Sequence, residues 1–240
     1  ISLALVDLIS IFVPYASRAY QGRPLARILS YVVSVIIVLV VLITSVFLVN
    51  DHHSRIEYEV NAQLEEKAKS ISTQLNDYLQ FHKNAVVMSS DAIGGGIDIK
   101  QQLTQLMDLY PGFTTSLYAM PNGYVAKSIP ETLLAGLSEE KRFVNDRPYF
   151  SQAQQYPKGY SSGVFQGRGL GNEPIVALSA PIYKNNEFYG VVEGSLKLER
   201  LEQYIPNLFN QTGELIILDA EQRIVFSSLA QFQILADFKT

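Results

Sequence analysis

Apolar residues follow three different patterns along this chain, and each pattern predicts a different element. The first is Ile28–Val49, an apolar run of 22 residues without a charge. At 1.5 Å of rise per residue, such a run forms a helix about 33 Å long, which is enough to cross the hydrocarbon core of a bilayer. We therefore predict a transmembrane helix over residues 28–49.

The second pattern is a stripe of apolar residues that recur mostly at steps of three or four, without glycine or proline, over about 50–90. This spacing predicts one long amphipathic helix of about 60 Å that continues out of the membrane. A second copy of the chain is the expected partner for part of the stripe, although a stripe alone does not fix the number of partners. The stripe consists of Ile56, Val60, Leu64, Ala68, Ile71, Leu75, Leu79 and Val86.

The third pattern consists of short runs rich in valine, isoleucine and tyrosine, separated by turn residues such as Asn122-Gly123. Sequential strands with tight turns form antiparallel sheets, and interspersed helices pack on one side, so an α+β fold is expected. Strands are predicted at 114–120, 124–129, 159–165, 174–183 and 187–198, short helices at 99–110, 150–156 and 198–207, and a second hairpin at 214–219 and 223–227.

Charges around the apolar run predict its orientation. Arg18, Arg23 and Arg27 precede the run without any acid, whereas the residues after it carry mixed charge. Short basic loops stay in the cytoplasm, so residues 17–27 are expected to be a cytoplasmic loop. The chain from Asn50 onward is then extracytoplasmic, which means periplasmic for a protein of a bacterial inner membrane.

Residues 1–16 are also apolar, apart from Asp7, and are too short to span a membrane alone. We interpret them as the end of an earlier transmembrane segment. A cleaved signal peptide is the alternative, but the run at 28–49 is too long for a signal-peptide core and no small-residue cleavage site follows it.

Composition excludes several functions. Residues 51–240 carry 16 Lys+Arg against 22 Asp+Glu, a net charge of −6, so nucleic acid is not an expected partner. The chain has no cysteine, which removes disulfides and thiol catalysis. His52, His53 and His82 are the only histidines and all lie on the long predicted helix, so no catalytic set, metal site or cofactor is expected, and an enzyme is disfavoured.

The strongest candidate for a binding site is Arg147, followed directly by Pro148. Pro148 can open a helix, which would hold the Arg147 guanidinium at the helix start facing the sheet. A fixed guanidinium suits bidentate capture of a carboxylate. The alternative is a structural ion pair with Asp146 or Glu193, and local sequence leaves the two interpretations even.

The strand 187–198 is expected to supply the opposite wall. Strand alternation places Phe188, Gly190, Val192, Gly194 and Leu196 on one side. The other side then carries Tyr189, Val191, Glu193, Ser195 and Lys197. Three polar residues in succession on this second side predict either a wetted surface or the lining of a pocket.

Four segments in order give the chain a resemblance to the double Cache (dCache) sensor domain, over roughly residues 50–240. They are Val144-Asn-Asp-Arg-Pro-Tyr-Phe150 with Ala153, Tyr160-Ser-Ser162, Pro174–Ile182 and Gly190–Leu196. This family forms the extracytoplasmic part of bacterial histidine kinases, chemoreceptors and diguanylate cyclases. The resemblance implies two stacked PAS-like units, a membrane-distal one at 91–205 and the start of a membrane-proximal one at 206–240.

The resemblance also implies roles for residues. Arg147 stands where the family binds a ligand carboxylate, whereas Ser195 and Ser162 stand where amino-acid-binding members carry aspartates. A small organic acid is therefore the favoured ligand, although a one-residue shift would bring Glu193 to an acid position and restore an amino acid as the ligand. The expected ligand-binding set is Arg147, Tyr149, Phe150, Tyr160, Ser161, Ser162, Ser179, Glu193, Ser195, Lys197 and Tyr118.

We predict the sensing part of a transmembrane receptor that binds a carboxylate and signals through the long helix to a cytoplasmic histidine kinase or diguanylate cyclase. The alternative from another class is a structural or dimerisation module without a ligand. In that case Tyr118, Tyr149 and Tyr160 would fill the pocket. An open cavity at Arg147 would argue against it.

Overall fold

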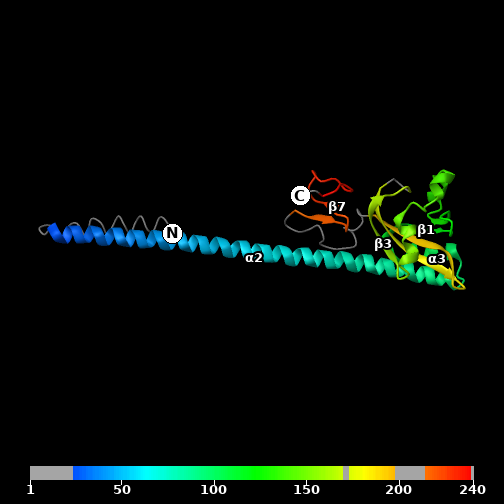
Figure 1. The fold of residues 1–240 in the computed structure, drawn as a ribbon, viewed down its shortest axis with the longest axis horizontal. Helices are drawn as coiled ribbons and strands as arrows, with labels where there is room; N and C mark the ends of the chain where they lie inside the picture. The colour runs from blue at the N-terminus through cyan, green and yellow to red at the C-terminus, as the bar shows by residue number, and fades with distance from the viewer. Residues whose placement is uncertain (1–23, 170–172, 198–213, 239–240) are drawn as a thin grey trace. The chain divides into compact units, whose positions relative to one another are not determined.

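The structure, a computed structural model, describes residues 24–169, 173–197 and 214–238. The chain divides into two compact units, Ile1–Ala68 and Lys69–Thr240. One helix, α2 (Pro24–Gly94, 71 residues), takes in both helices predicted at 28–49 and 50–90 (Figure 1). It ends at the three consecutive glycines that begin with Gly94, as expected for residues that favour a helix stop.

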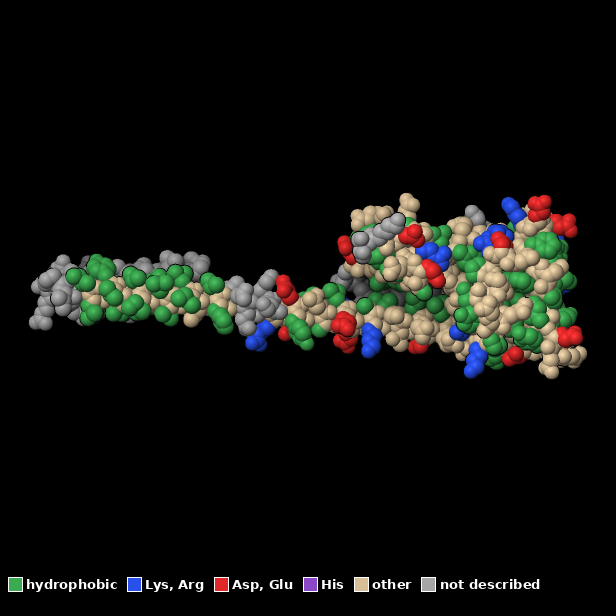
Figure 2. Space-filling model, viewed as in Figure 1, with side chains coloured by type: hydrophobic (Ala, Val, Ile, Leu, Met, Phe, Trp, Pro, Cys, Tyr) green, Lys and Arg blue, Asp and Glu red, His purple; other side chains and the backbone are tan. Residues whose placement is uncertain are grey.

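Within the first unit, the apolar segment Ile28–Leu48 has a mean hydropathy of 3.0 and none of it is buried inside the protein. Its exposed side chains are hydrophobic (Figure 2). Among the described residues, this is the one helical segment long and apolar enough to cross a membrane. A helix that is hydrophobic all round and has no protein cover is suited to lipid.

The second unit is built on an antiparallel sheet of five strands in the order β2-β1-β5-β4-β3. Asn185 and Asn186, at φ 50° and 66°, form the tight turn between β4 and β5, a conformation that asparagine tolerates. The strands are β1 (Phe113–Ala119), β2 (Val125–Ile129), β3 (Tyr160–Gln166), β4 (Pro174–Lys184) and β5 (Glu187–Lys197).

The two faces of the sheet pack against different elements. The end of α2 and helix α3 (Ile99–Leu109) cover one face, called here the helix face, where Val86 and Leu103 pack with Val192. A second cluster on the opposite face, called the cavity face, joins Leu117 and Val191 to short segments that follow β2. These segments are α4 (Thr132–Ala135), η1 (Glu139–Arg142), α5 (Pro148–Ser151) and η2 (Ala153–Gln155).

Strand β5 departs from the predicted alternation at its start. Ile182 pairs with Gly190 while Tyr183 pairs with Phe188, so Tyr189 is the extra residue of a bulge. Gly190 has φ 144°, which other residues rarely adopt. As a result Phe188 packs on the cavity face and Tyr189 on the helix face, the reverse of the sequence prediction, because a bulge shifts every side chain before it.

The second predicted hairpin is present in a shorter form, as β6 (Ile216–Leu218) and β7 (Ile224–Ser227). Val225 of this hairpin joins the core of the helix face. The helix predicted at 198–207 lies outside the described residues. The helix predicted at 150–156 instead begins at Pro148 and is divided into α5 and η2.

Candidate ligand-binding site

A cavity of about 210 Å³ lies on the cavity face of the sheet. Leu133 and Leu134, from α4, form part of its apolar wall together with Leu117 of β1. Its aromatic and charged lining consists of Tyr149, Phe165, Lys141, Arg147, Arg168, Glu173, Glu193 and Lys197.

Arg147 is fixed at the first turn of α5. Its backbone is extended, at φ −93° and ψ 133°, because Pro148 follows it. The guanidinium carbon lies 5.2 Å from the ring centroid of Phe165, a favourable cation–π placement. Burial and then the charge of Arg168 lower the pKa of Arg147, although a guanidinium stays protonated. Among the described residues, no acid forms an ion pair with Arg147.

The two acids that could have locked Arg147 have other partners. Asp146 pairs through both carboxylate oxygens with the guanidinium of Arg168. Burial would raise the pKa of Asp146, but the hydrogen bonds and charge of Arg168 outweigh it and lower the pKa. The interpretation of Arg147 as half of a structural ion pair is therefore not supported, and its guanidinium is available in the cavity wall.

Glu193, the other candidate partner, is a buried acid in the middle of β5 with an exposed fraction of 1%. Its Oε1 accepts a 2.6 Å hydrogen bond from Ser195 Oγ, whereas Oε2 is buried without a partner among the described atoms. Burial raises the pKa of Glu193 to about 8, against the lowering effect of the Ser195 hydrogen bond. At neutral pH this carboxyl is therefore mostly protonated.

Lys197 lies on the same side of β5 as Glu193 but forms an ion pair with Glu173. Among the described lining residues, the cations without an acidic partner are Arg147 and the exposed Lys141. Since Glu193 is mostly neutral, the cavity has an excess of positive charge. This arrangement can stabilise an anion.

The structure brings together five of the predicted site residues and places the others elsewhere. Tyr118 was expected in the pocket, but it lies on the opposite face of the sheet, the helix face. Its hydroxyl donates a hydrogen bond to the backbone carbonyl of Tyr189 there, at 2.9 Å. Strand alternation causes this, because Leu117 takes the cavity face. The predicted residues that line the cavity are Arg147, Tyr149, Glu193, Ser195 and Lys197.

The remaining predicted residues support the wall rather than line it. Ser179 Oγ donates at 2.6 Å to the backbone carbonyl of Tyr149, and Phe150 is buried in the cluster behind α5. Tyr160 packs at the edge of this cluster against Tyr156. Ser161 lies beside it on β3 and does not line the cavity.

Ser162 also has a structural place rather than a place in the lining. Its hydroxyl accepts a hydrogen bond from Ala177 N and donates one to Gly163 O. It thereby satisfies backbone groups at an irregular point of β3.

Sequence reasoning missed Arg168, Glu173, Thr115 and the leucines of α4. These residues reach the cavity from loops and neighbouring strands, so no local spacing relates them to Arg147. The sequence offered a signal for Arg168 alone, which is a charged residue within the glycine-rich stretch 167–171.

Comparison with known proteins places this sheet in a family. Residues 78–203, which are 126 of the 240 in the chain, match the model described as methyl-accepting chemotaxis protein-like, first PDC sensor domain. No curated protein matches the chain in sequence.

Solved structures with the same fold are ligand-binding domains of chemoreceptors. The domain of Pseudomonas fluorescens CtaA in complex with L-alanine has a TM-score of 0.60 at 15% identity, covering 74% of this chain and 76% of that one. The domain of Pseudomonas aeruginosa PAO1 PctC in complex with GABA gives 0.58 at 18% identity, covering 72% and 78%. The Campylobacter jejuni Tlp3 domain with 4-methylisoleucine gives 0.54 at 11%, covering 69% and 68%.

Proposed function

This chain belongs to the family of methyl-accepting chemotaxis protein-like first PDC sensor domains, and from that premise we propose that it senses a small carboxylate in the cavity beside Arg147. The chain is then the extracytoplasmic sensor of a membrane-anchored receptor. The cavity volume of 210 Å³ lies below the roughly 300–1,000 Å³ of sites for drug-sized ligands, so a small metabolite is the fitting occupant.

The single observation that carries this proposal is the state of the Arg147 guanidinium. It is half-buried, lines the cavity and has no acidic partner among the described residues. A ligand carboxylate would supply the missing countercharge with two parallel hydrogen bonds. The Phe165 ring beneath the guanidinium restricts its position, so less ordering is required on binding.

The neutral state of Glu193 favours an organic acid over an amino acid. A protonated carboxyl can donate its hydrogen to a second oxygen of the ligand, such as the other carboxylate of a C4-dicarboxylate. Lys197 and Arg168 are already paired with acids, so the exposed Lys141 is the second cation without an acidic partner among the described lining residues.

An amino acid is the second candidate, and one specific observation supports it. Glu193 Oε2, buried without a described partner, shares the cavity with Arg147. A ligand ammonium would stabilise the ionised form of Glu193 and lower its pKa. The solved relatives that hold L-alanine and GABA show that this fold accommodates amino acids in other proteins.

The test is a thermal titration of the full chain in detergent micelles with succinate, other small organic acids and L-amino acids. A ligand at about 100 times its dissociation constant adds ~2.7 kcal/mol to the free energy of unfolding. We expect Arg147→Ala to lose at least one such response. Lys158→Ala, which removes an exposed cation outside the cavity, serves as the matched control.

If Arg147→Ala folds and binds every positive compound as well as the parent chain does, the site assignment is wrong. Retention of binding in Arg147→Lys would also contradict bidentate capture, because an ammonium cannot reproduce the planar pair of donors.

The wider receptor architecture belongs to the same proposal. Residues 28–49 would cross the bacterial inner membrane, with the sensor unit in the periplasm and the exposed side of α2 facing a second copy. The β6–β7 hairpin would begin the membrane-proximal unit of a dCache arrangement, with the distal unit at 91–205. The family favours a chemoreceptor output over the kinase or cyclase expected from sequence.

A further inference from the structure

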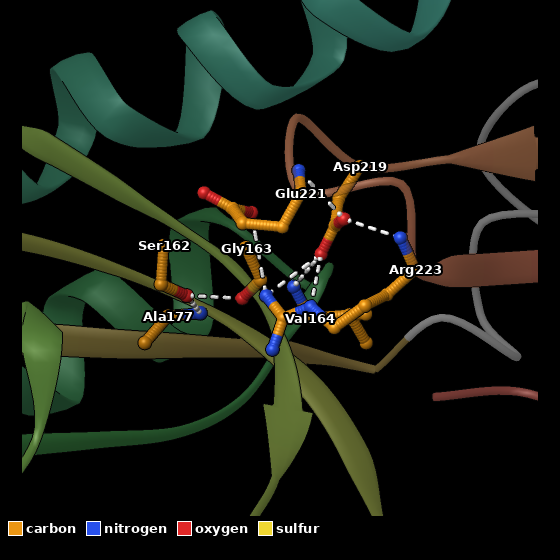
Figure 3. A network of polar contacts seen from close by, with 7 residues as sticks. All are labelled: Ser162, Gly163, Val164, Ala177, Asp219, Glu221 and Arg223. Atoms are coloured by element: carbon orange, nitrogen blue, oxygen red, sulfur yellow. Dashed lines mark hydrogen bonds and ion pairs between the residues drawn. The ribbon is translucent and has the colours of Figure 1, made fainter. Parts of the chain in front are cut away.

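Strand β3 contains a bulge at the edge of the sheet. Ser161 pairs with Leu178 and Val164 pairs with Val176, so two residues of β3 oppose the single Ala177 of β4. These two residues are Ser162 and Gly163, and the Ser162 hydroxyl bridges Ala177 N and Gly163 O across the irregularity (Figure 3).

The bulge decides which way Phe165 points. Tyr160 and Phe165 are five positions apart, so regular alternation would place them on opposite faces. With the extra residue between them, both pack on the cavity face, while Val164 packs on the helix face. The bulge therefore brings the Phe165 ring to Arg147 and to Tyr149, whose ring centroid is 6.1 Å away.

A residue from the C-terminal hairpin holds this bulge from outside the sheet. Asp219, in the turn after β6, accepts a 3.1 Å hydrogen bond through Oδ2 from the backbone N–H of Val164 (Figure 3). Its Oδ1 accepts from the N–H groups of Glu221 at 3.1 Å and Arg223 at 2.8 Å, which fixes the turn itself. The Asp219 side chain is 7% exposed and also pairs with the Arg223 guanidinium.

Gly163 leaves the space in which this contact is made. A Cβ atom at Gly163 would lie 2.3 Å from Arg223 Nη2, 2.6 Å from Glu221 Oε2 and 2.8 Å from Asp219 Oδ2. All three atoms are the far ends of side chains, so a Cβ atom there would displace these side chains rather than the backbone. The glycine and the three charged side chains therefore form one close fit between the hairpin and β3.

We propose that Asp219 is a positioning residue for the ligand cavity: by holding the β3 bulge, it sets the Phe165 ring beneath Arg147. The β6–β7 hairpin thereby acts on the cavity without touching it, and ligand binding and hairpin docking stabilise each other. This inference rests on the proposed function only in taking the cavity as the ligand site, and its test needs no ligand.

The experiment is amide hydrogen exchange of the full chain in detergent micelles, read at residues 160–166 and 144–151. Asp219→Asn keeps an oxygen for the turn but presents an NH2 group to Val164 N–H, so it breaks the docking contact. It also removes the hydrogen bond from Arg223 Nε to the same oxygen and the ion pair with Arg223. We expect exchange to accelerate roughly tenfold in β3, as for loss of a hydrogen bond to a charged group. Exchange should also accelerate at 144–151, the segment that holds Arg147 over the Phe165 ring.

Three comparisons separate a positioning role from a local one. Glu221→Gln, which changes an exposed acid of the same turn, should leave residues 144–151 unchanged. In a Phe165→Leu background, exchange at 144–151 should already be fast, and adding Asp219→Asn should not increase it further there. Gly163→Ala should reproduce the Asp219→Asn pattern from the other side of the contact.

Acceleration in β3 with unchanged exchange at 144–151 would overturn the proposal, since Asp219 would then stabilise only its own contact. If Asp219→Asn does not fold, Gly163→Ala decides. Loss of folding in both variants would also overturn it, because the contact would then support the whole fold rather than position Phe165. Failure of carboxylate binding with the expected exchange pattern would count against the proposed function alone.

Discussion

At the scale of single residues, the site depends on which charges already have partners. Asp146 pairs with Arg168, and Glu173 pairs with Lys197. Glu193 has no ion-pair partner among the described residues, and burial raises its pKa to about 8. Among the described lining residues, the charges left without an acidic partner are those of the half-buried Arg147 and the exposed Lys141. A site with an excess of positive charge and a neutral acid differs chemically from one with two fixed opposite charges.

Glu193 makes stability depend on pH in a defined direction. Its pKa in the folded chain, about 8, lies above the ordinary value of 4.5, so the folded state holds the proton more tightly. The free energy of unfolding should therefore fall by up to ~1.4 kcal/mol per pH unit as the pH rises through this window. We expect Glu193→Gln to remove this slope between pH 5 and 8 in urea titrations. An identical slope in the parent chain and the variant would contradict a buried, protonated Glu193.

The same substitution distinguishes the two ligand classes. Glutamine can donate a hydrogen bond as the protonated acid does, so an organic acid such as succinate should bind Glu193→Gln within a few-fold of the parent chain. An amino acid should bind roughly 30-fold more weakly or worse, because its ammonium loses a buried countercharge. Isothermal titration calorimetry measures both. Strong loss of succinate binding would exclude the hydrogen-bonding role given to neutral Glu193.

At the scale of elements, a buried histidine lies where α2 packs against the start of β1. His82 Nδ1 lies 2.9 Å from Tyr78 O, and its ring packs edge-on against Phe113. Gly112 leaves room for this arrangement, since a Cβ there would lie 2.5 Å from His82 Nε2. Burial lowers the pKa of His82, although the hydrogen bond to Tyr78 acts in the other direction.

Because the folded-state pKa of His82 lies below its ordinary value of 6.5, the folded state favours the neutral ring. The stability from this packing is fully present above about pH 6.5 and is lost as the pH falls towards the lowered pKa. In a Glu193→Gln background, which removes the opposing slope of Glu193, we expect the free energy of unfolding to decrease between pH 6.5 and 5, and His82→Gln to flatten that decrease. A flat profile in the Glu193→Gln background would show that His82 is not buried in neutral form.

At the scale of the whole molecule, the two units have surfaces of different character. The segment Ile28–Leu48 is hydrophobic and uncovered, whereas the unit from Lys69 onward has its own core on both faces of the sheet. A surface of the first kind is stable in lipid and not in water.

We therefore expect the full chain to fractionate with bacterial membranes and to resist extraction by alkaline carbonate. A chain that begins at residue 55 should be recovered in the soluble fraction with a cooperative thermal transition. Replacing Val38 and Leu42 by lysine should reduce membrane insertion of the full chain, at about 2.5–3.5 kcal/mol for each charge near the middle of the helix. Membrane retention of the chain that begins at residue 55 would show that the anchor lies elsewhere.

The sequence by itself determined the elements that depend on local chemistry. The apolar run, the helical stripe, the glycine stop at residue 94 and the Asn-Asn turn after β4 each act over a few neighbouring residues, so their signals are complete in the sequence. The extended backbone of Arg147 was predicted in the same way, because Pro148 determines it locally. The pairing of Asp146 with Arg168, which leaves Asp146 unavailable to Arg147, was not predicted, because it joins residues 22 positions apart.

Only the tertiary structure decided how the faces of the sheet are composed. Alternation predicts a face correctly until a bulge adds one residue, and the bulges at Tyr189 and at Ser162-Gly163 each reversed the side chains on one side of them. The protonation of Glu193 was likewise decided by burial, which depends on every element packed over β5. Bulges and burial arise from contacts between distant segments, and no short window of sequence contains both partners.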